Sequence, residues 1–389
     1  MHFLTRVRSA TMAWSAALVA ALAAATTIVP TPAIAHEQRP SRSAVFVQTN
    51  NVFGNAVLAY ARLADGTLRL VGRYPTRGRG DTQIDAPTGP LSSQGSLTYD
   101  RRRRLLYAVN AGSDTVSVFA VRGIRLRLLQ VIASGGLLPT SVAIHDTLVY
   151  VLNASGDGAI SGFRSVDDHL RPIAGSIRSL GLGNATLPNF RSSPAQIGIT
   201  DAGAQLLVST KGNGVVDEFA LTPGGRPASA PVITPTGPVP FGFVSDHRGR
   251  LVLADASGSA NSYHVGRSGA LIASGSAVAN GQNGTCWLVR ARGYFYATNT
   301  GSSTITGYAE AADGRLSLLQ VDGVSARTDA GPIDIAASSD GRQVFELNGL
   351  AGDLGVYAVA PDGALTQTST VQGLPAFNGF NGMEGIAVT

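Results

Sequence analysis

Two carboxylates stand where the acid or base of a reaction could be placed. Glu384 directly precedes the apolar C-terminal segment, and Asp334 follows Gly331-Pro332 at the start of another apolar segment. Partial burial of Glu384 near a positive charge such as Arg191 would shift its pKa and suit it to proton transfer. We therefore take Glu384 and Asp334 as candidate catalytic residues. The alternatives are a surface carboxylate for Glu384 and a cap of backbone N–H groups for Asp334.

Four further side chains are candidates for binding a ligand. Arg191 could hold a carboxylate through two parallel hydrogen bonds, or be an exposed loop charge. Lys211 is the single lysine of the chain and precedes a Gly-Asn turn, where it either binds an anion or is solvated with the turn. Trp287 could stack on a ring of the ligand or fill the centre of the fold. Gln196, near the start of an apolar segment, completes this group.

Asparagines and the single cysteine have more ordinary interpretations. Four asparagines that each end an alternating apolar segment could line a site, although such residues also favour hairpin turns through local hydrogen bonds: Asn110, Asn153, Asn299 and Asn348. Cys286 could be a nucleophile, but a small buried residue is the simpler interpretation. The sequence contains no Cys pair and no clustered His, so we expect neither a metal site nor a cofactor.

These residues must be positioned by strands. Only five Glu and one Lys occur among 389 residues, whereas Gly reaches 47, so the usual residues of solvated helices are scarce and turn residues abundant. An aromatic residue that closes a short strand before a turn recurs seven times: Tyr60, Phe119, Phe163, Phe219, Tyr263, Tyr308 and Tyr357. Spacings from 44 to 59 residues fit four-stranded propeller blades with loop insertions. We predict an all-β, seven-bladed β-propeller of antiparallel blades over residues 44–389.

The two ends of this domain are expected to meet. The first blade lacks an inner strand, and Gly385–Thr389 resembles an inner strand without a continuation. We predict that this segment completes the blade begun by Val45–Val47, which closes the ring. The candidate residues would then surround one mouth of the central channel. His145 and His247 fall in turns at the opposite end of the inner strands, so no imidazole is expected at that mouth.

The chain resembles the lactonase-type seven-bladed propellers, which include bacterial 6-phosphogluconolactonases and fungal 3-carboxy-cis,cis-muconate lactonising enzymes. The resemblance rests on Leu105–Ser113, Ser134-Gly-Gly136 with Pro139, Pro240–Phe243, Gly281-Gln282 with Cys286-Trp287, and the Asp-Gly turns at 65, 313 and 362. It implies a lactone hydrolase or cycloisomerase. The family's Pro-His pair and Gly-Pro-Arg-His run correspond here to Pro139-Thr140 and to residues 193–196, which lack His and Arg. The resemblance therefore does not supply catalytic residues.

The N-terminal 35 residues are typical of a cleaved export signal. Arg6 and Arg8 precede an apolar stretch, and the small residues up to Ala35 form a cleavage pattern, leaving a short extension over residues 36–43. We predict a secreted, monomeric protein without a membrane span after cleavage. The basic run at residues 101–104 lies between two strands without interleaved aromatics, so no nucleic-acid partner is expected.

Two functions stay open at this point. The first is a secreted lactone hydrolase or cycloisomerase that acts on a small carboxylated or sugar lactone at the channel mouth. The second is a non-catalytic propeller that binds a carbohydrate, a peptide or a component of the cell envelope.

Overall fold

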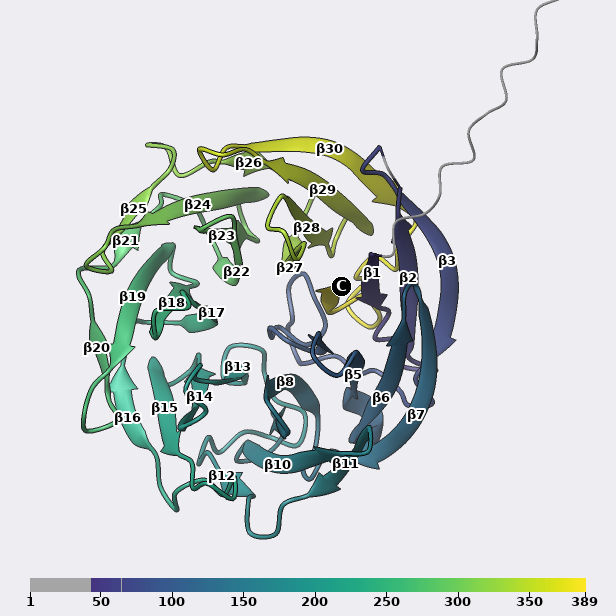
Figure 1. Ribbon diagram of the computed structural model, residues 1–389, viewed down its shortest axis with the longest axis vertical. Helices are drawn as coiled ribbons and strands as arrows, with labels where there is room; N and C mark the ends of the chain where they lie inside the picture. The colour runs from purple at the N-terminus through teal and green to yellow at the C-terminus, as the bar shows by residue number, and fades with distance from the viewer. Residues whose placement is uncertain (1–42, 64) are drawn as a thin grey trace, which may run out of the picture. The chain divides into compact units, whose positions relative to one another are not determined.

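The computed structural model describes residues 43–63 and 65–389, and these residues form a ring of seven antiparallel sheets (Figure 1). The predicted export signal and residues 36–42 of the predicted extension lie outside the described residues. The prediction of an all-β, seven-bladed propeller is confirmed. Among the described residues, no helix has the length and apolar character needed to cross a membrane.

Each blade runs from an inner strand at the channel to an outer strand at the rim. Blade 1 contains β31 (Ile386–Val388), β1 (Ala44–Gln48), β2 (Ala56–Arg62) and β3 (Leu68–Pro75). Blade 2 contains β4 (Leu97–Asp100), β5 (Leu105–Asn110), the short 3-10 helix η1 (Ala111–Ser113), β6 (Thr115–Arg122) and β7 (Arg125–Ala133). Blade 3 contains β8 (Pro139–His145), β9 (Leu148–Asn153), β10 (Ala159–Val166), β11 (His169–Pro172) and β12 (Arg178–Ser179).

The other four blades follow the same order. Blade 4 contains β13 (Pro194–Ile199), β14 (Gln205–Thr210), β15 (Val215–Ala220) and β16 (Val232–Pro235). Blade 5 contains β17 (Pro240–Ser245), β18 (Arg250–Asp255), β19 (Ser259–Val265), β20 (Leu271–Ala273) and β21 (Val278–Ala279). Blade 6 contains β22 (Thr285–Ala291), β23 (Tyr294–Asn299), β24 (Thr304–Glu310), β25 (Leu316–Leu318) and β26 (Ala326–Arg327). Blade 7 contains β27 (Pro332–Ala337), β28 (Gln343–Asn348), β29 (Asp353–Val359) and β30 (Leu365–Gln372).

The repeated aromatic residues form the core between blades. Every one of them lies on the third strand of its blade, and none is more than 4% exposed. The second strands are almost entirely buried, as in β5, whereas the outer strand β7 exposes Arg125 and Arg127 on either side of buried Leu126. Near the axis, neighbouring blades pack against both faces of a strand, so every residue of the strand is buried. At the rim, only one face of the strand is packed, so buried and exposed residues alternate.

The ring is closed as the sequence predicts. Strand β31 pairs antiparallel with β1, with Val388 opposite Val45 and Ile386 opposite Val47. Backbone hydrogen bonds extend this pairing on both sides, from Gln48 N to Gly385 O (3.0 Å) and from Thr389 N to Ala44 O (3.1 Å). The two ends of the domain therefore share one sheet, and this blade depends on both of them.

Two long loops meet on the face where the inner strands begin. One joins β3 to β4 over residues 76–96, and the other joins β12 to β13 over residues 180–193. Ile84 of the first loop forms a parallel bridge with Asn189 of the second. Figure 1 shows the first loop inside the ring, among the inner strands. It is this loop that determines what the candidate site contacts.

Candidate functional site

Residues 91–95, here called the strap, cross the channel at the starts of the inner strands. Trp287 Nε1 donates to Ser93 O (2.8 Å), and Gln94 N donates to Ala195 O (2.9 Å). Ser93 Oγ donates to Thr140 O (2.9 Å). The strap thus contacts blades 3, 4 and 6 from within the channel.

Gln94 fixes the strap most firmly. Its Nε2 donates to Leu288 O (2.8 Å), and its Oε1 accepts from Leu288 N (2.9 Å). The side-chain amide thus makes the same pair of hydrogen bonds to Leu288 that the backbone of a neighbouring strand would make. Gly242 makes room for this amide, because a Cβ at that position would lie 2.1 Å from Gln94 Oε1. On the opposite side, Ser141 Oγ donates to Gln94 O (2.6 Å). In the described arrangement the strap is therefore packed into the channel.

Glu384 lies fully buried beneath the strap. Its Oε2 accepts from Leu91 N (3.1 Å), while Oε1 has no hydrogen-bond partner within the part of the chain that the structure describes. Burial raises the pKa of Glu384 to about 8, and the nearby carboxyl of Asp334 adds to the rise. The N–H groups of Leu91 and Ser93 and the ammonium of Lys211 oppose it. A carboxyl group whose pKa lies this close to neutrality can both accept and release a proton near neutral pH.

Lys211 is the cation of the same cluster and is only 3% exposed. Its Nζ donates to Ser92 O (2.6 Å) and lies 5.0 Å from the centroid of the Phe241 ring. Burial lowers the pKa of Lys211 to about 7, although Cys286 and Glu384 favour its charged form. The Lys211 side chain is therefore not exposed to solvent at the turn that follows it. It donates to a backbone carbonyl oxygen inside the channel.

Asp334 links the inner strand of blade 7, β27, to the inner strand of blade 1, β31. Its Oδ1 accepts from Ile335 N (3.0 Å) and its Oδ2 from Ile386 N (3.2 Å), so the carboxylate caps two backbone N–H groups. Burial raises the pKa of Asp334 to about 7, against the effect of these two hydrogen bonds. A cavity of about 280 Å³ between the inner strands is lined by Asp334, Gln94 and Gln196.

Trp287 and Cys286 fill the wall beside Lys211. The Trp287 ring lies 4.7 Å from the Phe241 ring, centroid to centroid, and is 2% exposed. Burial raises the pKa of the Cys286 thiol to about 12, although the Lys211 charge opposes this. A thiolate nucleophile is therefore unfavourable at neutral pH.

Arg191 and Gln196 lie outside this cluster. Arg191 is exposed on the loop before β13, where its guanidinium carbon stands 5.4 Å from the centroid of the Phe190 ring. Gln196 uses its side-chain amide on the neighbouring inner strand: Nε2 donates to Phe243 O (3.0 Å), and Oε1 accepts from Phe243 N (2.7 Å). The positive charge near Glu384 thus comes from Lys211 rather than from Arg191.

The four asparagines are buried in the hairpins of their own blades. Asn110 Nδ2 donates to Thr115 Oγ1 (3.0 Å) and Ser117 Oγ (2.9 Å), and Asn299 Nδ2 donates to Thr304 Oγ1 (3.0 Å) and Thr306 Oγ1 (2.8 Å). Asn153 Nδ2 contacts Ser161 Oγ (3.3 Å). Asn348 Nδ2 lies between Glu346 Oε2 (3.1 Å) and Asp353 Oδ1 (2.8 Å). These contacts hold turns together, which matches the hairpin interpretation.

His145 and His247 have the positions expected from the sequence. His145 ends β8, and His247 lies in the turn after β17, both at the channel end opposite the strap. Among residues 43–63 and 65–389, no group of three His, Cys, Asp or Glu side chains is arranged to hold a metal ion. The strap residues Ser92, Ser93 and Gln94 were not foreseen from sequence, although the long 59-residue spacing from Tyr60 to Phe119 marks the insertion that contains them.

Comparisons with known proteins inform the fold. No protein-family model matches the chain, and no curated protein matches it in sequence. A putative 6-phosphogluconolactonase from Bacteroides fragilis is similar in structure, with a TM-score of 0.65, 17% identity, and coverage of 85% of this chain and 95% of that one. The periplasmic gluconolactonase of Pseudomonas aeruginosa is similar too, with a TM-score of 0.65, 18% identity, and coverage of 89% and 99%. The chain therefore has the seven-bladed propeller fold of these lactonase-type structures.

Proposed function

We propose that this chain is an exported lactonase-like propeller that opens or isomerises a small carboxylated or sugar lactone at the centre of its ring. The observation that carries the proposal is the buried cluster of Lys211 and Glu384 under the strap, whose pKa values of about 7 and about 8 both lie near neutrality. A buried site in which the pKa of a carboxyl group is raised and the pKa of an amine is lowered is typical of catalytic sites. Two structural neighbours, a putative 6-phosphogluconolactonase and a gluconolactonase, support the substrate class as a fold-level analogy.

The contacts of the strap support a way in which an acyl group could bind. Lys211 Nζ donates to the carbonyl oxygen of Ser92, and Trp287 Nε1 donates to that of Ser93. In the proposed reaction, a lactone carbonyl takes the place of the Ser92 carbonyl, and Lys211 stabilises the charge that develops on its oxygen. Water attacks the acyl carbon, and the ring C–O bond breaks. The ionised form of Glu384, which becomes populated as the pH approaches its pKa of about 8, accepts the proton of the water and returns it to the departing ring oxygen.

Substrate access then requires the strap to move. The carbonyl of Ser92 occupies the position that a substrate carbonyl needs, so the described arrangement is the closed form of the proposed site. Residues 76–96 form a long connection, and loops of this length commonly act as covers of active sites. Strap displacement is therefore an integral part of the proposal.

The test is hydrolysis by the purified mature protein. A panel of carboxylated and sugar lactones is incubated with the protein, and ring opening is followed by acid release. Lys211→Met and Glu384→Gln are each expected to lower the turnover at least a hundredfold. Asp313→Asn, at an exposed turn, is the matched control and is expected to retain it. An inactive wild-type protein across the panel, or full activity in both site variants, would refute the proposal.

A second candidate, a non-catalytic binder, is favoured by one observation on the same face. Phe53 and Phe380 stand beside each other with ring centroids 6.0 Å apart, and they are 81% and 55% exposed. Thr82 Oγ1 donates to Phe380 O (2.6 Å), which ties this pair to the loop that carries the strap. Exposed aromatic rings are common platforms for sugar rings. Saturable binding of an oligosaccharide that is lost in Phe53→Ala, in a protein without lactone turnover, would establish this function.

Export and oligomeric state belong to the proposal as well. We expect the mature protein to begin at His36 and to behave as a monomer. N-terminal sequencing of the exported protein and its sedimentation velocity test these two points. A mature chain that retains residues 1–35 would contradict the export proposal.

A further inference from the structure

A second cavity lies at the end of the inner strands opposite the strap. Its volume is about 670 Å³, within the range of small-molecule sites, and it is formed mainly by blades 4 and 5 with one edge from β8. The strap contacts the starts of the inner strands, at Thr140 and Ala195, whereas this cavity reaches their ends, at Ile144 and Ile199. We call it the far-side cleft.

The walls of the far-side cleft are apolar. Ile199 lines it from β13, Val244 from β17 and Val265 from β19, and all three are partly exposed, as expected for residues beside an open space. Buried Phe243 and Tyr263 lie behind them. Gln196 lines both this cleft and the central cavity, and its amide is bound to the backbone of Phe243, so it lies between the two spaces. The cleft therefore adjoins the central cavity, but its lining includes neither Lys211 nor Glu384.

One rim of the cleft carries a carboxylate. Asp201 Oδ2 accepts a hydrogen bond from Ser245 Oγ (2.6 Å), and His145 Nε2 lies 3.0 Å from Asp201 O. Both Asp201 and Ser245 line the cleft. One hydroxyl fills only one of the acceptor positions of a carboxylate, so Asp201 retains the capacity for a further donor.

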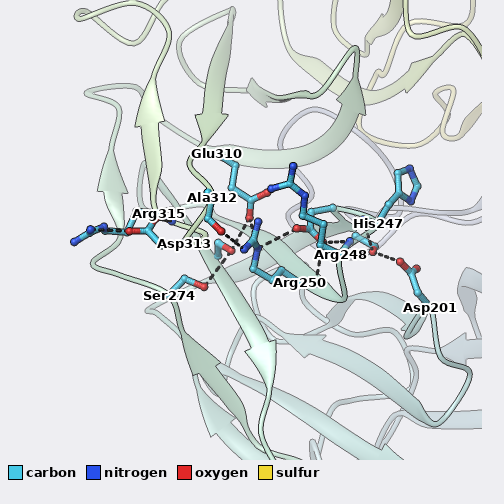
Figure 2. A network of polar contacts seen from close by, with 12 residues as sticks. Asp201, His247, Arg248, Arg250, Ser274, Glu310, Ala312, Asp313 and Arg315 are labelled. Atoms are coloured by element: carbon cyan, nitrogen blue, oxygen red, sulfur yellow. Dashed lines mark hydrogen bonds and ion pairs between the residues drawn. The ribbon is translucent and has the colours of Figure 1, made fainter.

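The turn that follows Ser245 on this rim is fixed by ion pairs and hydrogen bonds. Figure 2 shows Asp201, Arg250 and Glu310 in one network of polar contacts. Arg250 Nε contacts both Asp246 Oδ2 and Glu310 Oε1 at 3.0 Å, and Asp246 Oδ1 accepts from Arg248 N (2.7 Å) and Arg250 N (2.9 Å). The turn between β17 and β18 is thereby fixed in place next to Ser245. Rigid walls reduce the entropy that a ligand must lose on binding.

We propose that the far-side cleft is a second ligand site, which takes a small molecule with an apolar ring system and one N–H or O–H donor. The ring system packs against Val265, next to Phe243 and Tyr263, and the donor binds the carboxylate of Asp201. The charge of Asp201 favours a neutral or cationic ligand over an anionic one. This inference does not rest on the function proposed for the strap site.

The test uses N-phenyl-1-naphthylamine, a fluorescent apolar amine with a single N–H donor. Titration into the mature protein, with the dye excited directly, is expected to give a saturable rise of its emission. Ile199→Trp fills the cleft and is expected to weaken binding at least tenfold, and Asp201→Leu is expected to weaken it about threefold to tenfold. Ile233→Trp places the same new side chain on the exposed outer strand β16 and is expected to bind as the wild type does.

The variants decide between this cleft and other places for the dye. Should Ile199→Trp fail to fold, as judged by circular dichroism, Val265→Trp fills the cleft from the other blade and replaces it. The proposal is overturned by the lack of a saturable signal in the wild type. It is also overturned by unchanged affinity in a folded variant with a filled cleft.

Discussion

The buried carboxyl of Glu384 should make stability depend on pH in a specific direction. Its pKa is about 8 in the folded chain against 4.5 for the free side chain, so the folded state binds the proton more tightly than the unfolded state does. Its contribution to stability is fully present below pH 4.5 and is lost as the pH rises through 8. Such a shift corresponds to roughly 4–5 kcal/mol, at about 1.4 kcal/mol for each pH unit.

Glu384→Gln removes this titration while it keeps an acceptor for Leu91 N. Compared with the wild type, the variant should therefore gain on the order of 3–5 kcal/mol in its free energy of unfolding between pH 4 and pH 9. Urea denaturation at several pH values, with linear extrapolation, measures this difference. Asp362→Asn removes a carboxylate from an exposed turn and is the control. A difference between Glu384→Gln and wild type that stays constant with pH would show that Glu384 ionises freely and refute the buried site.

Three further outcomes are expected. Burial lowers the pKa of Lys211 from 10.5 to about 7, so Lys211→Met should be more stable than the wild type below pH 7 and should lose this advantage as the pH rises to 10.5. A difference in the free energy of unfolding that is the same at all pH values would contradict this. Deletion of residues 385–389 removes a buried inner strand and should cost at least about 4 kcal/mol, seen as a lower melting temperature; an unchanged melting temperature would refute the ring closure. Gly242→Ala should cost about 1–3 kcal/mol and speed hydrogen exchange in the strap, because the new Cβ meets Gln94; unchanged exchange would show that the strap is not held there.

The fold could be predicted because its determinants are local and repeated. Tyr60, Phe119 and their five equivalents mark the third strand of each blade, and each blade needs the same aromatic residue to fill the space against its neighbour. Ring closure by Ile386–Val388 could be predicted by counting strands. The sequence provides no inner strand for blade 1, and the C-terminal segment is a strand that belongs to no other blade. Repetition thus compensates for the weak signal of any single strand.

The site could be predicted only in part, because its contacts join loops that are far apart in the chain. Lys211 is bound to Ser92, 119 residues away, and nothing in the local sequence of either residue indicates this pairing. The long spacings at 59 and 56 residues revealed two insertions but not their pairing through Ile84 and Asn189. Arg191 was expected near Glu384, but it is exposed on its loop, and Lys211 is the charge that acts on Glu384.

The site under the strap is tested most directly by the emission of Trp287, the only tryptophan among the described residues. Its indole donates to Ser93 O, so displacement of the strap by a ligand changes its surroundings. During titration with lactones that the protein opens, the emission should change along a saturable curve, and Lys211→Met should abolish the response. Lactone opening with unchanged Trp287 emission would place the reaction elsewhere and contradict the proposed site.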